Sequence, residues 1–171
     1  MKITHYLLLV LLLTGVSCPG LQAQTPPDAN YQQFDFWLGD WEVYKYGTDT
    51  LVGISHIESI LNGYAIQEHY QSARGPYRGT SLNKYNPQTG SWEQYWVDNG
   101  GLTLHLTGGR EGAAMFMSGE TLAKGATVQH LITWAPDTEH TVRQTWQQST
   151  DGGATWVLLF DGLYRPKPRE D

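Results

Sequence analysis

The chain has 171 residues, of which 16% are charged and 12% aromatic, and its formal net charge is −6. This length suits one domain with a sizeable core, and the 19 glycines suit many short strands and turns better than long charged helices. Acidic residues outnumber Lys and Arg by 17 to 11, and no basic stretch is visible. The sequence therefore argues against nucleic acid or an anionic membrane as a partner.

The first 23 residues have the pattern of a secretory signal peptide. A basic residue precedes the apolar run at 6–13, and small and polar residues then lead to Ala23. The apolar run is too short to span a bilayer. We therefore expect an exported protein, periplasmic or secreted, that is cleaved after Ala23 and begins with a flexible lead over residues 24–33.

Lipidation at Cys18 is the alternative, and it would anchor the protein to a membrane. A bacterial lipobox usually has an aliphatic residue where this chain has Gly15. Cys18 is also the single cysteine of the sequence. After cleavage at Ala23 the mature chain would contain neither a disulfide nor a cysteine-ligated zinc.

Residues 34–43 (FDFWLGDWEV) form the most aromatic stretch of the chain, with four large rings in eight residues. Gly39 separates them where a backbone bend costs least. We expect a short helical plug that turns at Gly39 into a first strand, with Phe34, Phe36 and Trp37 covering one barrel end and Trp41 pointing into the core. The Gly39-x-Trp41 pattern resembles the Gly-x-Trp signature of lipocalins and related calycin barrels, whose tryptophan closes one end.

Turn signals then recur about every ten residues, and the runs between them are rich in Trp, Tyr, Thr, Val and Ile. They predict about ten short strands, with helical periodicity limited to one turn between Tyr31 and Leu38. Hairpin-length connections favour sequential antiparallel pairing. We expect an all-β fold, a single up-and-down barrel over residues 34–165 with a tail at 166–171, and a β-sandwich is the alternative.

Alternation predicts which side chains face inward on some of these strands. One face of a late strand would bury His130 together with its apolar neighbours Val128, Ile132 and Trp134. The next strand has one face formed by Val142, Gln144 and Trp146. Segment 92–98 carries aromatic residues on both faces, so its orientation stays open.

Residues 149–156 (STDGGATW) fit the S-x-D-x-G-x-T-W Asp-box found repeatedly in sialidase propellers. In that motif Ser and Asp satisfy the amides of a hairpin turn. A single copy does not make a propeller, and nothing in it supplies a nucleophile. We therefore expect a structural hairpin between the last two strands.

Several segments together extend the resemblance over residues 34–165. They are FDFWLGDWEV, IESILNG at 57–63, GTSLNKYN at 79–86, WEQYWVDN at 92–99, and STDGGATW followed by FDGLYR at 160–165. In this ordered series the chain resembles exported bacterial proteins known only as a lipocalin-like domain of unknown function. The resemblance implies a calycin-type barrel with an internal cavity and implies no reaction.

An enzyme would need polar side chains inside that apolar cavity, where desolvation shifts their pKa values. The candidates are His56, Glu58, Glu68, His130 and Arg143, and Tyr70 and His105 also belong to this polar set. A histidine beside a carboxylate could act as general base, and Arg143 could hold an anionic substrate. The alternative is that Glu58 and Arg143 are paired structural charges at a barrel mouth.

Five histidines follow the expected cleavage site, without an H-x-H or H-E-x-x-H spacing, so we predict no metal site and no cofactor. The barrel also resembles, more distantly, the nitrobindin haem proteins, which bind haem iron through a histidine near the chain end. The last predicted strand, at 155–165, has no histidine. His130 or His140 would have to replace that ligand, so haem is the minor alternative.

The aromatic content favours binding of a small apolar or aromatic ligand without chemistry, which is the leading hypothesis. The candidate lining residues are Trp41, Tyr64, Tyr85, Trp96, His105, Met115, Met117, Trp134 and Trp146. These side chains could instead simply fill the barrel. A structural or partner-binding role would predict an exposed apolar sheet face or edge, and the sequence leaves the oligomeric state open.

Overall fold

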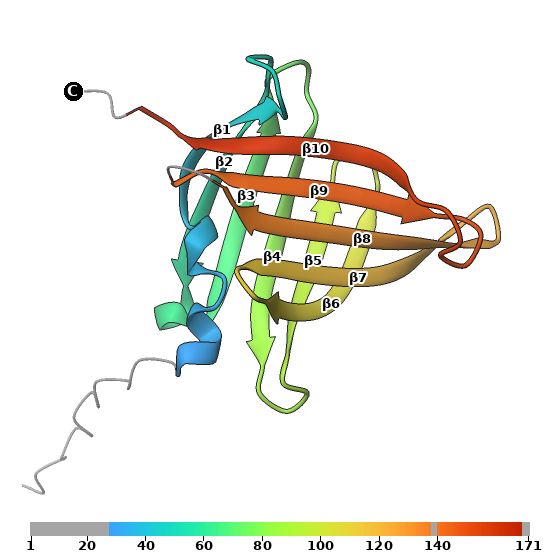
Figure 1. Cartoon of the computed structure of the whole chain (residues 1–171), viewed down its shortest axis with the longest axis horizontal. Helices are drawn as coiled ribbons and strands as arrows, with labels where there is room; N and C mark the ends of the chain where they lie inside the picture. Colours follow the sequence, from blue (N-terminus) through green and yellow to red (C-terminus); the bar gives the residue numbers. More distant parts are fainter. Residues whose placement is uncertain (1–27, 138–139, 169–171) are drawn as a thin grey trace, which may run out of the picture.

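The computed structural model describes residues 28–137 and 140–168, which form a closed antiparallel barrel of ten strands (Figure 1). The expected all-β, up-and-down barrel is confirmed, and the β-sandwich alternative is wrong. The predicted signal peptide, Cys18 and part of the lead and tail lie outside the described residues. Within them, no helix is long and apolar enough to cross a membrane.

Each strand pairs with the next one in the chain, and β1 pairs with β10 to close the barrel. The strands are β1 (Gly39–Lys45), β2 (Leu51–Ile60), β3 (Ala65–Ser72), β4 (Arg78–Asn86), β5 (Ser91–Asp98), β6 (Thr103–Glu111), β7 (Ala114–Ala123), β8 (Ala126–Pro136), β9 (Val142–Ser149) and β10 (Val157–Pro166). The described residues also include the short 3-10 helices η1 (Ala29–Gln32), η2 (Asp35–Trp37) and η3 (Leu61–Gly63). The predicted helical turn before the first strand is therefore present in 3-10 form.

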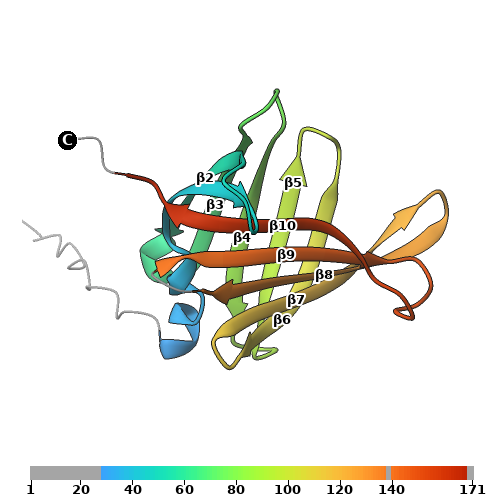
Figure 2. The ribbon, with the colours of Figure 1, turned by 45° about the horizontal axis from the view of Figure 1, so that its top comes forward.

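The two halves of the barrel cross at a steep angle. Strands β2 to β5 run across the direction of β7 to β10 in Figure 1, and Figure 2 shows the same crossing after a turn of 45°. This arrangement follows from the right-handed twist of strands, which accumulates around a closed sheet. The inner faces of both halves enclose the core.

Strand alternation decides which residues enter that core. On β8 the predicted inward face is confirmed, because Val128, His130, Ile132 and Trp134 are all buried. On β5 the structure resolves the open orientation, since Trp92 and Gln94 are buried and Tyr95 is exposed. The face that begins with Trp92 is therefore the inner one.

The aromatic stretch plugs one end of the barrel, as predicted. Phe34 and Trp37 are fully buried and stack with ring centroids 4.9 Å apart. Their rings also meet Trp134 across the barrel, at 5.3 and 5.6 Å. The indole of Trp41 points inward and donates a hydrogen bond to the carbonyl of Trp37 at 2.9 Å. One bond thus ties the plug to the first strand.

The predicted Asp-box is a hairpin between β9 and β10. Asp151 accepts hydrogen bonds from the Thr155 amide and hydroxyl, at 2.9 and 2.6 Å, and from Ser149 at 2.7 Å. These bonds, those from Thr155 first, lower the pKa of Asp151 to about 2. Trp156 stays partly exposed and donates to the Gly153 carbonyl. The motif is structural, as expected.

Replacing Trp41 by Ala tests the role of the plug in stability. We expect the free energy of unfolding to fall by about 3–5 kcal/mol, because the substitution removes a buried ring and a buried hydrogen bond. Urea unfolding followed by tryptophan fluorescence and circular dichroism measures the change.

The matched control is Trp156→Ala, which removes the same side chain from a site that is 38% exposed. Its cost should stay below about 1 kcal/mol. Equal losses in the two variants would contradict the assignment of Trp41 to the structural plug.

Candidate ligand cavity

A cavity of about 110 Å³ lies inside the barrel. It reaches from Tyr164, whose ring contacts the plug residue Trp37, to Tyr77 in the connection between β3 and β4. Its lining side chains come from both halves of the barrel. They are Glu68, Tyr70, Tyr77, Gln94, Trp96, Leu104, Ile132, Gln144, Trp146, Phe160 and Tyr164.

Glu68 is the one carboxyl group among these lining side chains, which include no Lys, Arg or His. It projects inward from β3 and is only 3% exposed. Ser55 on β2 donates a hydrogen bond to its Oε1 at 2.9 Å, and Ser81 on β4 donates to its Oε2 at 3.1 Å. Both oxygens of the buried carboxyl thus have a hydroxyl donor from a neighbouring strand.

A directed chain of hydrogen bonds stands behind Ser81. The Asn83 amide nitrogen donates to the Ile66 carbonyl at 3.3 Å and to Ser81 Oγ at 2.9 Å. Because a backbone carbonyl can only accept, this contact sets the orientation of the Asn83 amide. Gln94 in turn donates to Asn83 Oδ1 at 2.7 Å. Ser81 accepts from Asn83 and can therefore direct its own proton to Glu68.

Burial raises the pKa of Glu68 to about 7. Hydrogen bonding to Ser55 and Ser81 acts in the opposite direction, and so does Tyr164, whose hydroxyl donates to Gln144 close by. Burial also raises the pKa of the Tyr164 phenol, with the charge of Glu68 as the next cause. Near neutral pH the cavity therefore contains an acid that is easily protonated and deprotonated.

The aromatic walls of the cavity lie against glycines. The pairs are Tyr70 on Gly53, Trp96 on Gly79, and Phe160 on Gly162. A Cβ atom at any of these glycines would come within 2.1 to 2.4 Å of the aromatic side chain. Only a residue without a side chain allows each ring to lie flat against the sheet at this position.

Asp98 holds the outer end of the cavity together. Its Oδ2 accepts hydrogen bonds from the Tyr77 hydroxyl at 2.8 Å and from the Trp96 indole at 3.1 Å. Its Oδ1 accepts from the amides of Gly100 and Leu102, at 2.8 and 3.1 Å. Burial alone would raise the pKa of Asp98, but these hydrogen bonds, Tyr77 first, lower it. A carboxylate thus fixes two lining side chains.

His130 supports the wall without lining the cavity. The Trp146 indole donates to its Nδ1 at 3.1 Å, and its Nε2 lies 2.8 Å from the Thr121 hydroxyl. Because an indole nitrogen only donates, Nδ1 carries no proton, and the neutral ring donates from Nε2 to Thr121. Burial lowers the pKa of His130, which favours this neutral form. Both nitrogens of the suggested haem ligand are engaged and His140 is exposed, and haem stays the minor alternative.

The five predicted acid, base and anion-binding residues are not brought together, because strand alternation separates them. Glu68 lines the cavity, but His56 and Glu58 are exposed on the outer face of β2. Arg143 also lies on the outer face, where it forms a two-bond ion pair with Asp161 at 2.8 Å. Arg143 is therefore paired with Asp161, whereas the structural alternative expected Glu58 as its partner.

Of the nine predicted ligand-binding residues, Trp96 and Trp146 line the cavity. The others occupy three different surroundings. Four are buried in the packed core: Trp41, Met115, Met117 and Trp134. Two meet the ring of Tyr31 at the plug end: Tyr64 and Tyr85. His105 is exposed and stacks on Tyr95, because Leu104 and Leu106 take the inward positions of β6.

Sequence reasoning missed most of the cavity lining. The missed residues are Tyr77, Gln94, Leu104, Ile132, Gln144, Phe160 and Tyr164, whereas Tyr70 was among the polar candidates. The signal was partly available, because Gln94 and Gln144 share an inward face with tryptophans. A polar residue at an inward position of a closed barrel indicates a hydrogen-bonded interior or a cavity.

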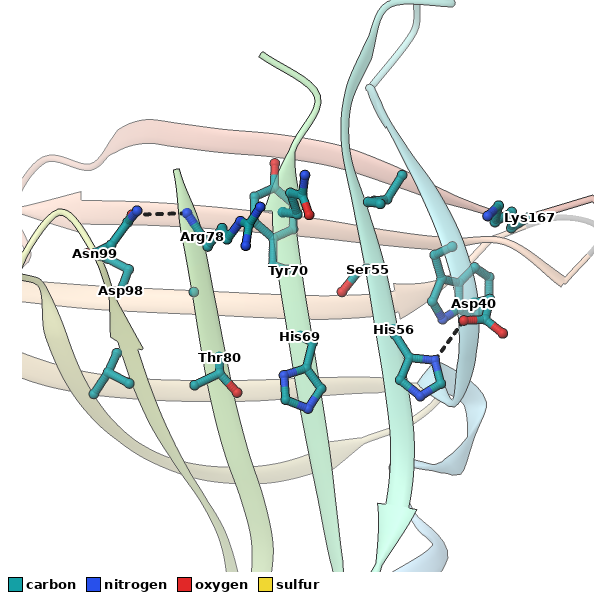
Figure 3. Close-up of a pocket in the computed structure, with 15 residues that line it drawn as sticks. Asp40, Ser55, His56, His69, Tyr70, Arg78, Thr80, Asp98, Asn99 and Lys167 are labelled. Carbon is teal, nitrogen blue, oxygen red and sulfur yellow. Dashed lines mark hydrogen bonds and ion pairs between the residues drawn. The ribbon is translucent and has the colours of Figure 1, made fainter. Parts of the chain in front are cut away.

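A second hollow of about 570 Å³ is an open groove on the outside of β1 to β5 (Figure 3). There His56 Nδ1 lies 2.6 Å from Asp40 Oδ1, and His56, His69 and Thr80 project side by side from successive strands. Within the described part of the chain no group of three or more His, Cys, Asp or Glu could hold a metal ion. Because ligand sites usually bury most of the ligand, the cavity inside the barrel is the better candidate.

An exposed apolar run begins strand β10. Val157, Leu158 and Leu159 have 58%, 50% and 44% of their surface exposed. Such a run is the pattern predicted for a partner-binding role, which stays a prediction.

Comparison of the chain with protein-family models and with curated protein sequences finds no match.

Replacing Glu68 by Gln tests the ionisation of the buried acid. Between pH 4.5 and 7 the folded protein keeps a proton on Glu68 that the unfolded chain releases, so raising the pH destabilises the folded state. When the pH is raised from 4.5 to 8, the unsubstituted protein should therefore lose up to about 3 kcal/mol of unfolding free energy relative to the Glu68→Gln variant. Urea unfolding of both proteins at both pH values measures this difference.

The comparison controls for other acids, because Asp98 and Asp151 have lowered pKa values in both proteins and cancel in the difference. A difference that is constant with pH would show that Glu68 does not titrate in the folded state as described.

Proposed function

We propose that this chain is an exported lipocalin-like protein that holds a small, mainly apolar or aromatic ligand in its internal cavity. The observation that carries the proposal is a cavity with aromatic and aliphatic walls and one cluster of hydrogen-bonding groups around Glu68. Small barrels that bind ligands combine these two features. The export part of the proposal rests on the pattern of residues 1–23, and the family part on the motifs between residues 34 and 165.

The volume of the cavity limits the size of the ligand. About 110 Å³ is well below the roughly 300–1,000 Å³ of pockets for drug-sized molecules, and close to the ~150 Å³ apolar cavity known to bind benzene. The enclosed part of the ligand should therefore be about the size of a single six-membered ring. A longer ligand would have to extend past Tyr77 at the outer end.

The arrangement of ionisable groups favours binding over the catalytic alternative. General acid–base catalysis by the predicted set would need at least two of its members to reach the same reacting atoms. Glu68 alone among them lines the cavity. Its phenolic neighbours, Tyr70 and Tyr164, both have raised pKa values, which keeps their protons in place near neutral pH.

Binding of benzene and phenol tests the proposal directly. We expect both to bind with dissociation constants of about 1 mM or below, which corresponds to about 4 kcal/mol for six or seven non-hydrogen atoms. Isothermal titration calorimetry and saturation-transfer NMR measure the binding. Native mass spectrometry of protein purified without denaturant would additionally detect a ligand retained from the cell.

Ile132→Phe should abolish this binding, because it adds a ring to a buried residue that lines the cavity. Ile54→Phe is the matched control, since Ile54 is exposed on the outer face of β2, and it should bind as before. Circular dichroism confirms that both variants fold. Equal binding to both variants would place the ligand outside the cavity and refute the proposal.

A further inference from the structure

Among the residues that the structure describes, no positively charged side chain pairs with Glu68 inside the barrel. The residues that line its cavity include no Lys, Arg or His, and none of the four ion pairs found among the described residues involves Glu68. A buried carboxylate without a counter-ion destabilises the folded state. Because Glu68 lies in the wall of a cavity, a ligand could supply the positive charge that neutralises its carboxylate.

The hydrogen bonds around Glu68 are arranged for its ionised form. Ser55 and Ser81 each donate to a different carboxyl oxygen, and the chain through Asn83 and Gln94 orients the Ser81 proton toward Glu68. An ionised carboxylate accepts about four hydrogen bonds, and the Tyr164 hydroxyl is a third hydrogen-bonding neighbour of Glu68 beside the two serines, so about one acceptor position remains. It suits a donor on a ligand within the cavity.

The walls favour positive charge in the same place. Trp96, Trp146, Tyr70 and Phe160 all line the cavity, and the faces of such rings attract a desolvated cation. The carboxylate of Asp98 stands at the outer end, and the whole chain has a net charge of −6. Both charges favour the approach of a cation over that of an anion.

We propose that the cavity selects a small protonated primary amine, whose ammonium group donates a hydrogen bond to Glu68 while its hydrocarbon part contacts the aromatic walls. This inference rests on the proposed function, because it names the ligand class of the same cavity. It excludes carboxylates and phosphates as ligands, since Glu68 would repel both.

The amine must bind the ionised form of Glu68, so its affinity should depend on pH. The polar groups that contact Glu68 or share its cavity are three tyrosines, two serines and two amides: Tyr70, Tyr77, Tyr164, Ser55, Ser81, Gln94 and Gln144. The serines and amides do not titrate, and all three tyrosines have raised pKa values. Glu68, with its pKa of about 7, is therefore the group that controls amine binding between pH 5 and 8.

The test compares n-butylamine with n-butanol, which has the same number of non-hydrogen atoms but no charge. Isothermal titration calorimetry at pH 8 should show butylamine binding at least about 10-fold more tightly than butanol. Lowering the pH to 5 should weaken butylamine binding by up to about 100-fold, because only about 1% of Glu68 is then ionised. The affinity for butanol should stay nearly unchanged. Glu68→Gln should remove the preference for the amine.

The matched control is Glu58→Gln, which makes the same change at an exposed residue on the outer face of β2 and should keep the preference. If Glu68→Gln does not fold, the pH profile of the unsubstituted protein decides. Butanol and benzene binding without any preference for butylamine would refute the amine inference and leave the proposed function standing. Failure of all three probes at both pH values would refute both.

Discussion

Closure of the barrel between β1 and β10 is the constraint on which the rest of the structure depends. The two strands pair from Trp41 opposite Pro166 to Lys45 opposite Gly162. Once the sheet is closed, every strand must direct alternate side chains into one interior of limited width. A polar residue in an inward position then needs a partner from another strand, because water is largely excluded. The network around Glu68 follows from this requirement.

Closure also couples the plug to the cavity, although the two occupy different parts of the barrel. Trp37 and Trp41 both contact the ring of Tyr164, with centroids 6.1 and 6.2 Å apart. Tyr164 lines the cavity, and its hydroxyl donates a hydrogen bond to Gln144. The aromatic stretch therefore both closes one end and positions a side chain beside Glu68, so plug stability and cavity shape are linked.

Much of the fold could be predicted from short-range pattern. Turn residues at regular spacing indicate ten strands, and the aromatic stretch predicts the plug, because both signals are local. Alternation correctly buries His130 and Trp41. It would also have turned His105 outward, since the leucines on either side of it claim the inward positions of β6. Choosing His105 for its chemistry overlooked that pattern.

The site was less predictable, because proximity across a barrel depends on closure and on the crossing of strands. Gln144 meets Tyr164 across 20 residues of sequence, and Ser55 meets Glu68 across 13. Glu68 was recognised as a candidate, but two of the candidates proposed with it, His56 and Arg143, lie on the outer face of the sheet. Moving one residue along a strand places the side chain on the opposite face of the sheet. The local sequence also does not indicate which inward side chains of different strands contact one another.

The glycines beneath the aromatic walls have a consequence for how such a barrel diverges. Gly53, Gly79 and Gly162 determine how closely Tyr70, Trp96 and Phe160 lie to the sheet, yet none of the three is among the lining residues. A methyl group at any of them would displace its ring into or away from the cavity. Two homologous barrels could therefore share every lining residue and still hold molecules of different size, with the difference encoded in residues that their ligands never touch.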